Sequence, residues 1–137
     1  MNNRLWNTKN PAQGEYKRVL CLCSAGLLRS PTTAVVLAGE PYNYNTRAAG
    51  VESDYALIPV DDVLIDWADE IVCVNAGTAD RLRSLFHADD LPTVVVLNIP
   101  DNYGYRSPKL VHMIKEQYDK QLAELIGLAG NVGKSNM

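Results

Sequence analysis

Apolar and polar residues alternate in blocks along the 137-residue chain, in a pattern typical of α/β proteins. Short runs rich in Val, Ile, Leu and Cys are separated by longer segments in which apolar residues recur every three or four positions. Such alternation favours βαβ units and a parallel sheet, with a functional site at the carboxyl ends of the strands. The runs that predict strands are 18–23, 43–49, 70–75 and 93–97.

The segments between and after these runs predict four helices. The first extends from about residue 30 to residue 39, because Pro41 disfavours helical geometry at the residue before it. The second begins at Asp61 and Asp62, and the third opens at Thr78, whose hydroxyl is a good N-cap. The last begins after Ser107 and has the clearest apolar stripe, formed by Leu110, Val111, Ile114, Tyr118, Leu122 and Leu125.

The two ends of the chain differ in character. Residues 1–16 are rich in Asn, Gln, Pro and Gly around an isolated Leu5 and Trp6, and they predict a flexible N-terminal arm. Residues 17–137 contain all the predicted strands and helices and no internal repeat or linker. A segment of this length forms one domain with a core of its own, so we expect a single domain over residues 17–137.

Composition and charge narrow the class of protein. With 47% hydrophobic and 21% charged residues, the chain has the make-up of an ordinary soluble globule, and no apolar run approaches membrane-spanning length. A net charge of −3 provides no general basic field for nucleic acid. Three cysteines make a disulfide framework unlikely, so we expect a cytoplasmic protein. Neither His87 nor His112 lies near a cysteine pair, and we expect no metal or other cofactor.

The most informative segment is the run Cys23-Ser-Ala-Gly-Leu-Leu-Arg29-Ser30-Pro31, where the first predicted strand gives way to the first helix. A five-residue loop between Cys and Arg can turn its backbone N–H groups around an oxyanion, and the following helix adds its positive end. A thiolate is favoured in the same place, which makes Cys23 the candidate nucleophile. Arg29 offers a planar fork for two phosphoryl oxygens. Ser30 can donate a hydrogen bond to Cys23 and then cap the helix.

The predicted phosphate-binding loop consists of Ser24, Ala25, Gly26, Leu27, Leu28 and Arg29. The competing interpretation is structural. In it, Cys23 is only a buried residue of the strand, and Arg29 is an arginine at the start of a helix whose guanidinium is exposed to solvent.

At these residues the chain resembles the low-molecular-weight protein tyrosine phosphatases, whose loop has Cys, five residues, Arg and then Ser or Thr directly after the first strand. It resembles more closely a branch of small predicted bacterial tyrosine phosphatases. The resemblance extends through segments 46–50, 67–71 and 99–105, and covers roughly residues 17–128. It implies a three-layer αβα sandwich whose four-stranded parallel sheet has the order 2-1-3-4. It also implies metal-independent hydrolysis of phosphomonoesters, chiefly phosphotyrosine, through a phosphocysteine intermediate.

Phosphoryl transfer to a thiolate requires a second chemical group, because the departing alkoxide or phenoxide needs a proton. Asp101 is the candidate general acid: it follows the fourth predicted strand, at the same sheet edge as Cys23, and resembles the family's acid. The alternative is an aspartate that only forms a turn. Tyr103, Tyr105 and Tyr55 are candidates for a wall against which an aromatic substrate packs. The expected partners are a phosphorylated protein or peptide or a small aryl phosphate.

Departures from the family's pattern keep other functions open. The family commonly has Asn and Ser at the positions of Gly26 and Ala48, and that polar brace of the loop is absent here. A catalytically weak module that binds phosphopeptides is therefore one alternative. An arsenate reductase needs further cysteines for a disulfide relay. Cys21 is poorly placed for an unstrained bridge to Cys23, so the only remaining cysteine is Cys73. A phosphate-carrying domain of a sugar phosphotransferase system is a third, which Arg29 disfavours because a carrier must preserve its phosphocysteine.

Overall fold

The computed structural model describes residues 17–24, 29–52, 56, 58–100 and 107–130. Its strands and helices alternate along the chain, as the sequence predicts. In chain order they are β1 (Arg18–Cys23), α2 (Arg29–Ala38), β2 (Asn45–Gly50), α3 (Asp62–Trp67), β3 (Glu70–Cys73), α4 (Ala76–Leu85), the 3-10 turn η1 (Ala88–Asp90), β4 (Thr93–Val96) and α5 (Pro108–Gly130). None of the described helices combines the length and the apolar character that spanning a membrane requires.

The four strands form one parallel sheet in the order β2-β1-β3-β4, which confirms the predicted topology. In the register of β1 with β2, Cys23 lies opposite Gly50, at the end of both strands. β1 also pairs with β3, and β3 pairs with β4. The carboxyl ends of all four strands therefore meet at one edge of the sheet, where the loop after Cys23 begins.

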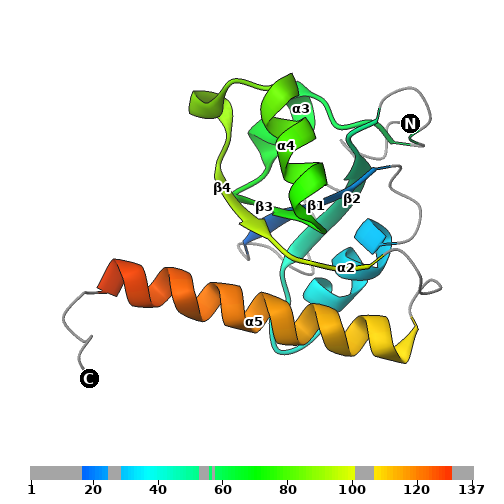
Figure 1. Ribbon diagram of the computed structural model, residues 1–137, viewed down its shortest axis with the longest axis vertical. Coiled ribbons are helices and arrows are strands. Elements are labelled where there is room, and N and C mark those ends of the chain that lie inside the picture. The colour runs from blue at the N-terminus through cyan, green and yellow to red at the C-terminus, as the bar shows by residue number, and fades with distance from the viewer. Residues whose placement is uncertain (1–16, 25–28, 53–55, 57, 101–106, 131–137) are drawn as a thin grey trace.

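Helices cover both faces of the sheet, as the three-layer prediction required (Figure 1). Helices α2 and α5 pack on one face, where Leu37, Leu110 and Ile114 are buried against Val19 and Val72. Helices α3 and α4 pack on the other face with a second buried cluster, which contains Leu20, Leu22, Leu64, Trp67, Ile71 and Leu82. Burial on both faces explains why β1 and β3 are almost uninterrupted apolar runs.

Helices α3 and α4 each begin after a residue whose side chain accepts a backbone N–H group. Helix α3 begins after Asp61, whose Oδ1 accepts the Leu64 N–H at 3.0 Å. Helix α4 is capped by Asn75, whose Oδ1 accepts the N–H of Thr78 at 2.8 Å. The prediction that Thr78 is the N-cap is therefore wrong by three residues. Both residues are good caps, and Asn75 takes the role because its backbone is still extended at the end of β3.

A buried polar cluster lies at the edge of the sheet opposite the Cys23 loop, where β3 begins. Glu70 is only 4% exposed, and its carboxylate accepts from Lys17 Nζ at 3.0 Å and from the Tyr118 hydroxyl at 2.8 Å. The Tyr118 hydroxyl also lies 3.2 Å from that of Tyr44, and burial raises the pKa of Tyr118. The ring of Tyr42 packs edge-on against that of Tyr118. This cluster joins α5 to the sheet far from the candidate site.

We expect Tyr118→Phe to lower the free energy of unfolding by about 1.5–3 kcal/mol, because it removes a hydrogen bond to a buried carboxylate. Tyr42→Phe is the matched control, since its hydroxyl donates to Asp119 in an exposed setting at 2.7 Å. That change should cost about 0.5 kcal/mol. Urea unfolding of the two variants and the wild type measures both values. Equal losses would show that the buried hydrogen bond to Glu70 contributes no more to the free energy of unfolding than the exposed one to Asp119.

Candidate active site

The candidate nucleophile ends β1, one of the two inner strands of the sheet. Cys23 is the last residue of β1 and is 3% exposed. Its carbonyl accepts the N–H of Val51 at 3.0 Å, and the carbonyl of Ser24 accepts that of Glu52 at 2.9 Å. The segment that follows β2 therefore continues the pairing with β1 past the point where the loop begins. The thiol is placed by a rigid element, with its backbone bonded on the β2 side.

Ser30 lies directly beside this thiol, as the spacing predicts. Cys23 Sγ donates to Ser30 Oγ at 3.2 Å, and the Ser30 hydroxyl donates in turn to the Ala49 carbonyl at 3.3 Å. Helix α2 begins one residue before Ser30, so the expectation that Ser30 caps the helix is wrong. The hydroxyl is occupied by tertiary partners instead. When the thiol is deprotonated it can no longer donate, and the Ser30 hydroxyl becomes the donor that stabilises the thiolate.

Arg29 opens α2 and is 8% exposed. Its Nη1 donates to the carbonyl of Ile99 at 3.1 Å, in the segment that follows β4. The N–H of Ile99 donates to the Val74 carbonyl at 2.9 Å, so this segment is itself tied to the sheet. A guanidinium has five N–H donors in a planar fork, and the bond to Ile99 fixes the direction of one of them. The structure thus brings a thiol, a hydroxyl and an oriented guanidinium to the same sheet edge.

The remaining cysteines have no comparable surroundings. Cys21 and Cys73 are fully buried free thiols, and burial raises the pKa of each, that of Cys73 to about 12. Cys73 belongs to the cluster on the opposite face of the sheet from Cys23. Cys21 faces the same side as Cys23 but lies two residues away in an extended strand, near the upper limit of Cα separation for a disulfide. Neither residue offers the accessible second thiol that an arsenate reductase relay requires.

Several predicted site residues lie outside the described part of the chain. They are the loop residues Ala25, Gly26, Leu27 and Leu28, the candidate acid Asp101, and the candidate wall residues Tyr55, Tyr103 and Tyr105. Their roles stay predictions. Ala48, the other position of the missing brace, lies in β2 and packs beside the cluster beneath α2.

Two contacts of the site were not visible in the sequence. Ser30 donates to the carbonyl of Ala49, 19 residues away, and Arg29 donates to the carbonyl of Ile99, 70 residues away. Every residue has a backbone carbonyl, so the residue type does not identify these acceptors. The last helix also has polar residues at positions where its apolar stripe would continue. Gln117 and Gln121 follow Leu110 and Ile114 by seven residues each, so two amides occupy positions of helical spacing that continue an apolar stripe.

Comparison with known proteins identifies the fold. No family model matches the sequence, and no curated protein matches it. Among solved structures, the tyrosine phosphatase Wzb from Escherichia coli K30, in complex with phosphate, has a TM-score of 0.60 at 14% identity. The match covers 82% of this chain and 99% of that one. YwlE arginine phosphatase from Geobacillus stearothermophilus has a TM-score of 0.58 at 20% identity, over 80% and 96% of the two chains.

A thioredoxin-dependent arsenate reductase from Corynebacterium glutamicum is also similar, with a TM-score of 0.54 at 13% identity, over 89% of this chain and 71% of that one. The chain therefore has the fold of the low-molecular-weight phosphatases, as its motifs implied. Because proteins with three activities share this fold, the chemistry has to be argued from the residues of this chain.

Proposed function

We propose that the protein is a cysteine-dependent phosphomonoesterase that hydrolyses phosphotyrosine in proteins or peptides, without a metal. The observation that carries the proposal is the arrangement at the start of α2: Cys23 Sγ lies 3.2 Å from the Ser30 hydroxyl, and the adjacent Arg29 is buried and oriented by Ile99. A thiol nucleophile beside a hydroxyl donor and a guanidinium is the set of groups that phosphoryl transfer needs.

The reaction has two steps. In the first, the Cys23 thiolate attacks phosphorus, an S–P bond forms, and the bond between phosphorus and the ester oxygen breaks. Arg29 holds two equatorial oxygens as charge redistributes, and Asp101 gives a proton to the departing oxygen. In the second, the Asp101 carboxylate takes a proton from water, which attacks the phosphocysteine and releases inorganic phosphate and the Cys23 thiolate. The Ser30 hydroxyl stabilises that thiolate as it departs.

The choice of phosphotyrosine rests on the candidate wall residues Tyr55, Tyr103 and Tyr105, whose rings would pack on an aromatic ester. The three cysteines are free thiols, which suits a reducing compartment, and we place the protein in the cytoplasm. Burial of Cys21 and Cys73 disfavours the thiol relay of an arsenate reductase.

The purified protein should hydrolyse nitrophenyl phosphate and phosphotyrosine peptides in the presence of a chelator, and orthovanadate should inhibit it. Rates should fall from phosphotyrosine to phosphoserine, because an alkoxide is a poorer leaving group than a phenolate. Phosphoarginine belongs in the same panel, since one of the similar structures is an arginine phosphatase. Preference for phosphoarginine would contradict the assignment of phosphotyrosine. Binding of phosphopeptides without turnover would identify a binding module and contradict the enzyme.

A further inference from the structure

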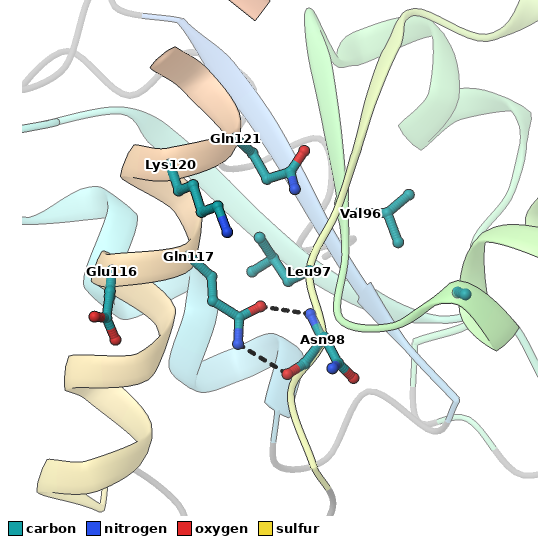
Figure 2. A pocket seen from close by; sticks show the side chains of 8 residues that line it. Val96, Leu97, Asn98, Glu116, Gln117, Lys120 and Gln121 are labelled. Carbon is teal, nitrogen blue, oxygen red and sulfur yellow. Dashed lines mark hydrogen bonds between the residues drawn. The ribbon is translucent and has the colours of Figure 1, made fainter. Parts of the chain in front are cut away.

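A side chain of the last helix forms two hydrogen bonds with the backbone just after the edge strand β4, next to a contact of the candidate site. Strand β4 is an edge strand, and the segment that follows it reaches Ile99. Figure 2 shows Gln117 of α5 beside this segment, at a cavity of about 620 Å³ that Asn98 and Gln121 also line. The Asn98 N–H donates to Gln117 Oε1 at 2.6 Å, and Gln117 Nε2 donates to the Asn98 carbonyl at 2.9 Å. One amide thus engages both backbone groups of one residue.

The alternation of an extended chain explains why the backbone groups of Asn98, an exposed residue, are available to a side chain of α5. The N–H groups of Leu97 and Ile99 both face inward, where they donate to the carbonyls of Cys73 and Val74. The backbone groups of Asn98, between them, point to the side on which the sheet has no further strand. The Gln117 amide has a donor and an acceptor spaced like those of a peptide group. It therefore replaces a neighbouring strand at this one residue.

This replacement determines the orientation of one peptide plane. The Asn98 carbonyl and the Ile99 N–H belong to the same planar unit. Gln117 Nε2 holds the carbonyl end at 2.9 Å, and the Val74 carbonyl accepts from the N–H end at 2.9 Å. Pro100 follows Ile99 and restricts it to extended backbone. With the preceding plane held at both ends, and with φ and ψ of Ile99 both restricted to the extended region, the range of directions open to the Ile99 carbonyl is narrow. That carbonyl accepts from Arg29 at 3.1 Å.

We propose that Gln117 is a positioning residue of the active site, which acts on the substrate through the Asn98–Ile99 peptide and the Arg29 guanidinium. It touches no reacting atom. The inference rests on the proposed phosphatase function, because it assigns a task to Arg29. It also gives α5 a part in the site, although Gln117 lies 88 positions after Arg29 in the sequence.

The test uses orthovanadate as an oxyanion probe and a nitrophenyl phosphate as substrate. Gln117→Ala should weaken vanadate inhibition about tenfold, the effect of misaligning one hydrogen bond to a charged group. Gln117→Glu should lose as much, since an ionised carboxylate still accepts the Asn98 N–H but cannot hold its carbonyl. Gln121→Ala is the matched control, one turn along α5 at the same cavity, and should behave like the wild type.

A double-mutant cycle separates positioning from a general loss of structure. In an Arg29→Lys background, Gln117→Ala should change vanadate affinity by less than about twofold, because the group that Ile99 orients is gone. An equal loss in both backgrounds, or wild-type affinity in Gln117→Ala, would overturn the inference while the phosphatase function stands. A wild type that neither binds vanadate nor turns over aryl phosphate would overturn the proposed function, and this inference with it.

Discussion

Replacing Cys23 by Ser should lower kcat for aryl phosphates on the order of 10⁴-fold or more, with oxyanion binding largely retained. A serine hydroxyl is nearly isosteric with the thiol and keeps a partner in Ser30, so the loop should still bind vanadate. It is not ionised near neutral pH, so it is a far weaker nucleophile than a thiolate. Steady-state turnover and vanadate-induced stabilisation of the same sample measure the two effects separately.

Two further variants show whether the loss is specific. Cys21→Ala removes a buried thiol from the same face of the same strand, two residues away, and should leave kcat per folded molecule near that of the wild type. Arg29→Lys should also be strongly impaired, because a point charge does not reproduce the bidentate fork. Near-wild-type turnover in Cys23→Ser would contradict the phosphocysteine mechanism. A loss of the same size in Cys21→Ala would mean that the strand is damaged rather than the nucleophile removed.

The strands that are buried on both faces could be predicted from the sequence, because burial requires apolar residues. Strand β1 is apolar at every position from Val19 to Cys23 because helices cover both of its faces, and this run is visible without any structure. The sheet order was predictable only through the resemblance carried by the run from Cys23 to Pro31. Local hydrophobic patterns do not contain the strand order, since it depends on which connections cross over others.

The helix caps and the hydrogen-bond partners in the site were harder to predict, because several side chains or carbonyls can take each role. Asn75 and Thr78 both have capping side chains, and the geometry at the end of β3 selects the first. Ser30 also has a capping side chain, but Cys23 and the Ala49 carbonyl engage it instead. The Ile99 carbonyl illustrates the general limit. A backbone acceptor has no identity in the sequence, so the residue that orients Arg29 becomes visible only when the chain is folded.

Asp101→Asn should slow phosphotyrosine cleavage far more than nitrophenyl phosphate cleavage. A positioned general acid contributes about 10²–10⁴-fold, and its benefit depends on how much the departing oxygen needs a proton. The phenolate of tyrosine, whose conjugate acid has a pKa near 10, departs poorly without one, whereas a nitrophenolate departs readily. Asp101 follows Ile99 by two residues, and Ile99 accepts a hydrogen bond from Arg29, so the candidate acid is close in sequence to a contact of the site.

The measurement is single-turnover formation of phosphocysteine with a series of aryl phosphates of graded leaving-group pKa. Loss of the acid leaves more negative charge on the departing oxygen in the transition state, so the rate should fall more steeply with leaving-group pKa in Asp101→Asn than in the wild type. Asp62→Asn is a suitable control, because Asp62 is an exposed residue in the first turn of α3. Parallel dependences for Asp101→Asn and the wild type would show that Asp101 donates no proton in this step, and another acid would then have to serve the leaving group.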